Sequence, residues 1–260
     1  MKRINLAGLS IDVLDVGSGP PLLYLGPEHF GDANLPFIER LAEHRRVVAP
    51  RYPGFDGRTP PTDFRSVDDL AYMVLDLMDT LALTDTLVVG SSLGGWVALE
   101  MAVRSVARMR GLVLFAPLGV KGGDRTSRDF ADFNALSAKD ARAALFADLK
   151  AVPEFPDMDD GQMEQVGLDR QYLAHYAWNP YFHNPRLPRW LHRVTVPTRL
   201  VWGEADGYCL PSNAPRLLDG IPDASMTRLP NVGHYPQIEA IEESIAAIVA
   251  LEAQIEGEAT

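Results

Sequence analysis

Short apolar runs that are typical of buried strands alternate with helical patterns along most of the chain. The first two runs are separated only by Ala7 to Ser10, which predicts an antiparallel hairpin. The later runs are nearly continuous in hydrophobicity, as in a parallel sheet that is covered on both faces. Strands are predicted at Ile4 to Leu6, Ile11 to Val16, Pro21 to Leu25, Arg46 to Ala49, Thr86 to Val89, Gly111 to Phe115, Thr198 to Trp202 and Ser225 to Leu229.

Helices are predicted between these strands and at the C-terminal end. Ser66 precedes Asp69 and an apolar set at helical spacing, which is the pattern of a capped amphipathic helix. Further helices are predicted at Leu35 to His44, at Trp96 to Val103 and at Ile238 to Ile255, with Gly257 to Thr260 as a frayed end.

The stretch from residue 118 to residue 193 interrupts the alternation. Its composition is helical, most clearly from Asn134 to Lys150, and it interleaves aromatic residues and histidines. Its aromatic side chains either pack on the sheet or face a ligand, and in a cap over a pocket they do both. We therefore expect a core of residues 1–117 and 194–260 with a helical cap, residues 118–193, inserted between them. Trp178, Tyr181 and Phe182 are candidates for contact with a substrate.

The composition is that of a folded globular chain. Of its 260 residues, 47% are hydrophobic and 23% are charged, which argues against disorder, collagen-like and coiled-coil structures. The formal net charge of −11 argues against binding to nucleic acid or to an anionic membrane surface. The chain has no membrane-length apolar run and no signal-peptide pattern, and its single cysteine, Cys209, cannot form an internal disulfide. We therefore expect a cytoplasmic protein.

The run Gly90-Ser91-Ser92-Leu93-Gly94 fits the pattern G-x-S-x-G and directly follows a predicted strand. A serine on a sharp turn from strand to helix has a strained backbone, so the residues two before it and two after it must be small. Gly90 and Gly94 meet this requirement around Ser92. The motif therefore indicates Ser92 as a nucleophile.

A serine hydroxyl becomes a nucleophile when a base accepts its proton, and the base needs a carboxylate that orients it. Asp206 follows the end of a predicted buried strand, with Glu204 as the neighbouring alternative, and His234 follows the last strand. The remaining histidines are expected on the surface or in the cap, with His29 at the mouth of the site: His29, His44, His175, His183 and His192.

The chain resembles the α/β-hydrolase superfamily in these motifs and in their order along the chain, Ser92, Asp206, His234. The resemblance also includes Pro21 to Leu25 and the turn from Ala49 to Phe55, so it covers nearly the whole chain. It implies a mostly parallel eight-stranded sheet flanked by helices, with a helical cap. It also implies Ser92 as the nucleophile, His234 as the general base and later the general acid, and Asp206 as the group that fixes the imidazole tautomer.

The oxyanion hole departs from the family pattern. One donor is the backbone N–H of Leu93, and the second comes from the loop after the strand Pro21 to Leu25. The family usually has His-Gly in this loop, where this chain has Gly26-Pro27. Because proline has no N–H, Glu28 is the candidate for the second donor through its backbone N–H, and its carboxylate is expected to turn away.

These residues predict a serine hydrolase that cleaves a small-molecule substrate, a small or medium carboxylic ester, through an acyl-enzyme. One alternative is hydrolysis of a carbon–carbon bond in a vinylogous diketone acid, which needs a cationic side chain to hold the substrate carboxylate. Candidates for that cation lie in or near the expected cap: Arg125, Arg128, Arg142, Arg170, Arg186 and Arg189. The other alternative is a non-catalytic ligand-binding protein of the same fold, because the altered loop weakens the oxyanion hole.

No cofactor is expected. The chain has no G-x-x-x-x-G-K-[ST] phosphate loop, no H-E-x-x-H motif and no Cys-x-x-Cys pair, so neither nucleotide nor metal binding is predicted. Relatives that open epoxides or remove halides use an aspartate nucleophile, and Ser92 argues against both activities. Arg51 stands where the family commonly has aspartate, and we expect it in a surface ion pair.

Overall fold

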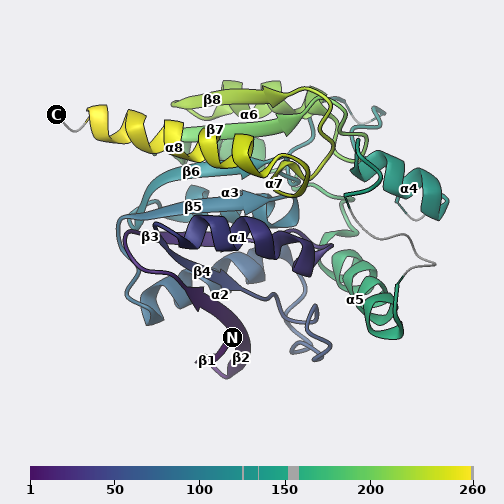
Figure 1. Cartoon of the computed structure of the whole chain (residues 1–260), viewed down its shortest axis with the longest axis horizontal. Coiled ribbons are helices and arrows are strands. Elements are labelled where there is room, and N and C mark those ends of the chain that lie inside the picture. The colour runs from purple at the N-terminus through teal and green to yellow at the C-terminus, as the bar shows by residue number, and fades with distance from the viewer. Residues whose placement is uncertain (125, 134, 152–157, 259–260) are drawn as a thin grey trace.

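The computed structural model describes residues 1–124, 126–133, 135–151 and 158–258. Within these residues, eight strands form one sheet in the order β1-β2-β4-β3-β5-β6-β7-β8 (Figure 1). β2 pairs in antiparallel fashion with β1 and β4, and the other neighbours are parallel. The predicted hairpin and the mostly parallel sheet are therefore confirmed. The strands are β1 (Lys2–Leu6), β2 (Leu9–Val16), β3 (Pro21–Leu25), β4 (Arg46–Pro50), β5 (Thr86–Ser91), β6 (Met109–Phe115), β7 (Thr198–Gly203) and β8 (Ala224–Leu229).

Helices cover both faces of the sheet (Figure 1). Successive side chains of a strand point to opposite faces, so that Leu22 and Leu23 of β3 belong to two different apolar clusters. One cluster includes Phe37 and Ile248, from helices on one face, and the other includes Leu70 and Val97, from helices on the opposite face. The helices of the first face are α1 (Leu35–Ala42), α7 (Pro236–Glu239) and α8 (Ile241–Glu258), and those of the second are α2 (Val67–Thr80), α3 (Leu93–Arg104) and α6 (Ala214–Gly220).

The start of α2 follows the prediction from the sequence. The Ser66 hydroxyl accepts a hydrogen bond from the Asp69 N–H, and the Asp69 carboxylate accepts one from the Ser66 N–H at 2.8 Å. Two N–H groups that the first turn leaves without partners are satisfied in this way.

The C-terminal helix differs from the prediction. The expected helix from Ile238 to Ile255 is divided at Ala240, whose backbone is not helical (φ −142°, ψ 62°). The short α7 is oriented by Glu239, whose carboxylate accepts hydrogen bonds from the backbone N–H groups of Gly233 and Asp148 at 2.7 Å each. The helix α8 then continues to Glu258 rather than fraying at residue 257, and residues 259 and 260 lie outside the described part of the chain.

The segment between β6 and β7 contains α4 (Ala138–Leu145), α5 (Asp160–Ala177) and the 3-10 turn η3 (Leu187–Arg193). Of the stretch with helical composition, Asn134 to Lys150, the helix α4 takes up Ala138–Leu145 and ends at Phe146, whose backbone is extended, and Asn134 lies outside the described residues. A capping box of Asp159 and Gln162 begins α5, and this start signal is present in the local sequence. α4 and α5 lie beyond the carboxyl ends of the parallel strands (Figure 1). None of the helices in the described ranges has the length and apolar character needed to cross a membrane.

Candidate active site

Ser92 lies on the sharp turn between β5 and α3. Its backbone has φ 51° and ψ −115°, a conformation that L-residues rarely adopt. A side chain at Gly94 would overlap the carbonyl oxygens of Leu25 and Gly26, so the turn packs closely against the loop that follows β3. This close approach requires the glycine, and it brings Leu93 beside the loop that carries Glu28.

A continuous chain of hydrogen bonds joins Ser92, His234 and Asp206. His234 Nε2 lies 2.7 Å from Ser92 Oγ, and His234 Nδ1 lies 2.8 Å from Asp206 Oδ2. Ser92 and His234 are fully buried, and Asp206 is 3% exposed. The three residues that the motifs singled out therefore meet as the sequence predicted, although Ser92 is more than a hundred positions from the other two.

Asp206 is held by four donors. Its Oδ1 accepts from the backbone N–H groups of Tyr208 and Cys209 at 2.9 Å each, and its Oδ2 accepts from Trp202 Nε1 at 3.0 Å and from His234. The alternative acid, Glu204, is exposed. The structure thus places Asp206, and not Glu204, against the imidazole.

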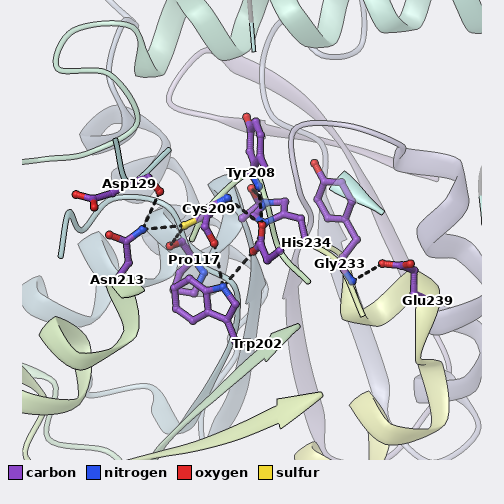
Figure 2. A network of polar contacts seen from close by, with 12 residues as sticks. Pro117, Asp129, Trp202, Tyr208, Cys209, Asn213, Gly233, His234 and Glu239 are labelled. Atoms are coloured by element: carbon purple, nitrogen blue, oxygen red, sulfur yellow. Dashed lines mark hydrogen bonds and ion pairs between the residues drawn. The ribbon is translucent and has the colours of Figure 1, made fainter. Parts of the chain in front are cut away.

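The loop that carries His234 is fixed from several sides (Figure 2). The His234 N–H donates to the carbonyl of Leu145 at the end of α4, at 2.7 Å. The imidazole lies between two rings, with centroids 4.7 Å from that of Tyr208 and 4.6 Å from that of Tyr235. The Gly233 N–H donates a hydrogen bond to the Glu239 carboxylate (Figure 2). Burial raises the pKa of Glu239, although the hydrogen bonds from backbone N–H groups lower it. No local sequence pattern predicts these contacts, because several of them come from segments distant in the chain.

The Glu28 side chain does not turn away from the hole, and that prediction was wrong. Its Oε2 accepts a hydrogen bond from the Leu93 N–H at 3.1 Å, and its Oε1 accepts from Ser92 Oγ at 3.0 Å and from the Tyr235 hydroxyl at 3.2 Å. The residue is 1% exposed. The Leu93 N–H, which was predicted as one donor of the oxyanion hole, is therefore occupied by the carboxylate of Glu28.

This carboxylate is stabilised as an anion. Burial raises the pKa of Glu28, but the His29 and His234 imidazoles and the N–H groups of Glu28 and Leu93 outweigh it, so the pKa lies below the ordinary value. Burial raises the pKa of Tyr235 well above its ordinary value, and the charge of Glu28 raises it further. The Tyr235 hydroxyl therefore keeps its proton and donates to Glu28.

Two groups compete for the hydroxyl proton of Ser92. Its Oγ lies 3.0 Å from Glu28 Oε1 and 2.7 Å from His234 Nε2, and a hydroxyl has only one proton to donate. A Ser92 hydroxyl that donates to Glu28 is therefore not donating to His234.

A cavity of about 560 Å³ lies beside the loop after β3, and Glu28 is part of its wall. Ser92 and His234 do not line it. Glu28 thus belongs to the wall of this cavity and also contacts Ser92. A smaller cavity of about 50 Å³ is lined by His29, Arg142, Asp169 and Arg170 among others.

The candidates for substrate contact are placed differently from one another. His29 is buried rather than at an open mouth, and it lines the smaller cavity with Nδ1 3.8 Å from Asp169 Oδ2. Trp178 is 57% exposed, Phe182 is buried, and the Tyr181 hydroxyl donates to the Ala131 carbonyl. These last three line neither cavity.

Other predicted residues can also be placed. His44, His175 and His192 are exposed and His183 is partly buried. Arg51 lies 3.8 Å from Asp32 in the expected surface ion pair. Among the arginines, Arg142 and Arg170 line the smaller cavity, and Arg125 lies outside the described residues. The described residues contain no group of three or more His, Cys, Asp or Glu side chains that could hold a metal ion.

A serine on a strand-to-helix turn, joined to a histidine and an aspartate from later loops of a mostly parallel sheet, defines the α/β-hydrolase class. The chain belongs to the alpha/beta hydrolase family, whose model matches residues 17–247. Haloalkane dehalogenase 2 of Mycobacterium tuberculosis is 29% identical, over 92% of this chain and 90% of the relative. The 2-hydroxymuconate semialdehyde hydrolase of a Pseudomonas species is 26% identical, over 92% and 88%.

Solved structures show the same fold. A bacterial membrane phospholipase A superposes with a TM-score of 0.83 at 22% identity, covering 98% of this chain and 86% of the other. A meta-cleavage product hydrolase of Pseudomonas fluorescens superposes with a TM-score of 0.75 at 22% identity, covering 100% and 98%. The protein is therefore a hydrolase by family.

Proposed function

We propose that this protein is a serine hydrolase that cleaves a small or medium carboxylic ester through an acyl-enzyme. The observation that carries the proposal is the buried hydrogen-bonded chain from Ser92 through His234 to Asp206. His234 accepts the Ser92 proton as Oγ attacks the ester carbonyl, and it then donates this proton to the leaving alcohol. A water molecule next gives a proton to His234 and attacks the acyl-enzyme, which releases the acid and restores Ser92. Asp206 holds the imidazole in the required tautomer throughout.

The proposed oxyanion hole consists of the backbone N–H groups of Leu93 and Glu28. The Leu93 N–H now donates to the Glu28 carboxylate, and a negative charge in this position opposes the negative charge of a tetrahedral intermediate. Turnover therefore requires the Glu28 side chain to move. The adjoining cavity of about 560 Å³ gives it space to do so.

We further propose that residues 118–193 act as a cap. The end of α4 contacts both loops of the site, because the Leu145 carbonyl accepts from His234 N–H and the Ala144 carbonyl from Gly207 N–H. A movement of this segment would thus displace the loops that carry His234 and Asp206.

We place the protein in the cytoplasm, because Cys209, its single cysteine, is buried and without a disulfide partner.

Carbon–carbon bond hydrolysis of a vinylogous diketone acid is the second candidate. It is favoured by relatives such as the 2-hydroxymuconate semialdehyde hydrolase. Arg142 and Arg170 beside His29 in the smaller cavity offer the cationic surroundings that a substrate carboxylate needs. Haloalkane dehalogenation is not proposed, since Ser92 occupies the nucleophile position.

The test is a panel of p-nitrophenyl esters of increasing acyl length, assayed with the protein and with Ser92→Ala. A fluorophosphonate probe followed by mass spectrometry locates the reactive serine in the same samples. Ester turnover that is lost in Ser92→Ala, with the probe on Ser92, supports the ester hydrolase. Labelling without ester turnover favours the carbon–carbon hydrolase, which is then assayed by the loss of the dienolate absorbance. A protein that neither turns over nor is labelled is a ligand-binding member of the family.

A further inference from the structure

The position of Glu28 restricts which substrates can open the site. Its carboxylate accepts hydrogen bonds from Ser92, Leu93 and Tyr235, and it is buried. An ionised carboxylate only accepts hydrogen bonds, and the oxygens of a neutral ester also only accept them. A neutral ester therefore displaces Glu28 without offering it a new partner. The cost of an unpaired carboxylate in a buried site opposes this displacement.

The cavity of about 560 Å³ that Glu28 lines is rich in negative charge. Four of its lining side chains are carboxylates, namely Glu28, Asp32, Asp159 and Asp169, and one is basic, Arg51. Arg51 already lies beside Asp32, with its Nη2 3.8 Å from Asp32 Oδ1. Asp169 is 5% exposed and accepts a hydrogen bond from Gln165 Nε2 at 2.7 Å, so it is a second buried carboxylate in the same wall.

Aromatic groups complete this wall. Phe30, Tyr52 and Phe55 line the cavity, and the Tyr52 and Phe55 rings meet edge to face with centroids 6.0 Å apart. The Tyr52 side chain is 4% exposed, and its hydroxyl has no hydrogen-bond partner among the described residues. Carboxylates, aromatic faces and an unpaired hydroxyl oxygen together are the surroundings that attract an organic cation.

From these observations we propose that the protein acts on esters that carry a cationic group, such as an ammonium, and that Glu28 is the residue that selects them. The cation binds in the cavity of about 560 Å³ between Glu28 and Asp169. It draws the Glu28 carboxylate away from Leu93 and Ser92, which leaves the Leu93 N–H for the carbonyl oxygen of the ester. This inference rests on the proposed serine hydrolase activity.

The test compares two p-nitrophenyl esters of the same shape. One is the ester of γ-trimethylammoniobutyrate, and the other is its neutral isostere, in which a tert-butyl group replaces the trimethylammonium group. The unaltered protein should prefer the cationic ester in kcat/KM by about tenfold or more. In Glu28→Ala, the preference should fall towards one, mainly because the neutral ester is hydrolysed faster.

Matched variants separate charge at this site from charge in general. Asp169→Asn should reduce the preference, whereas Glu39→Gln, which removes one negative charge on the exposed side of α1, should leave it unchanged. Glu28→Gln keeps the shape of the side chain and should also lose the preference, which covers the case that Glu28→Ala does not fold. An equal rate for both esters in the unaltered protein, or a preference that survives both Glu28 variants, would overturn the proposal. Fluorophosphonate labelling of Ser92 in the same variants distinguishes failure of this proposal from failure of the serine hydrolase proposal. If Ser92 is labelled but the charge preference is absent, only the proposal about the cation is overturned.

Discussion

Trp202 Nε1 donates a hydrogen bond to Asp206 Oδ2 at 3.0 Å, to the same oxygen that lies 2.8 Å from His234 Nδ1. Trp202 is the last residue but one of β7, so the sheet itself holds the carboxylate. Because two backbone N–H groups bind the other oxygen, Asp206 has no freedom to rotate away from His234. The carboxylate is thereby fixed by groups that the strand and the turn after it provide.

We expect Asp206→Asn to reduce kcat for an ester by about a thousandfold to ten-thousandfold, because an amide favours the wrong imidazole tautomer. Glu204→Gln is the matched control, since Glu204 belongs to the same loop and is exposed. Its kcat should stay within about twofold of the unaltered value, since isolated surface substitutions have small effects. Steady-state kinetics on one ester gives kcat for both variants. An equal loss of kcat in both would argue against Asp206 as the carboxylate that orients His234.

We expect Glu28→Ala to speed the reaction of Ser92 with a fluorophosphonate by about tenfold or more. The substitution empties the space in front of the Leu93 N–H, which then binds the phosphonyl oxygen. The second-order labelling rate is measured by mass spectrometry, with Ser92→Ala as the unlabelled control. Equal labelling rates with and without the Glu28 carboxylate would mean that this carboxylate does not obstruct the Leu93 N–H.

The lowered pKa of Glu28 predicts how its contribution to stability varies with pH. Because the pKa is lower in the folded protein than in the unfolded chain, the unfolded chain binds more protons near that range. The ionised Glu28 therefore stabilises the fold above the unfolded pKa of about 4.3, and this contribution is lost as pH falls through the folded pKa.

Urea unfolding of the protein and of Glu28→Gln from about pH 7 to pH 3 tests this dependence. The difference between the two free energies of unfolding should be constant at neutral pH and should shrink in acid. The side-chain hydrogen bond from Arg46 lowers the pKa of Asp15 to about 2. Asp15 is present in both proteins, so its contribution to the pH dependence cancels in the difference. A difference that stays constant down to pH 3 would contradict the expectation.

We expect Gly94→Ala to destabilise the fold by about 2 kcal/mol or more, because the new methyl group overlaps the Leu25 and Gly26 carbonyls. Gly167→Ala is the opposite control. Gly167 lies within α5 and has open space around its Cα, so alanine should stabilise the helix by about 0.5 to 1 kcal/mol. Thermal unfolding of both variants measures whether each substitution lowers or raises the free energy of unfolding. A Gly94→Ala protein as stable as the unaltered one would mean that the turn can shift.

Local patterns in the sequence determined most of the fold. The strands follow from short apolar runs, and the start of α2 follows from Ser66 and Asp69, whose hydrogen bonds lie within a single turn. Ser92 was identified because its strained turn requires small residues two positions before and after it, and Gly90 and Gly94 occupy those positions. These features depend on interactions between residues close in the chain, and so the sequence alone contains them.

The tertiary structure decided what distant segments do to one another. The Glu28 carboxylate lies against the Leu93 N–H because Ser92, Leu93 and Tyr235, from two segments far from Glu28 in the chain, surround it with donors. Likewise, the Glu239 carboxylate, at the end of the short α7, accepts hydrogen bonds from the N–H groups of Gly233 and Asp148. In both cases, a carboxylate accepts hydrogen bonds from donors that are supplied by other segments of the chain. Its direction is set by which hydrogen-bond donors the folded chain brings within reach, and sequence spacing does not encode that proximity.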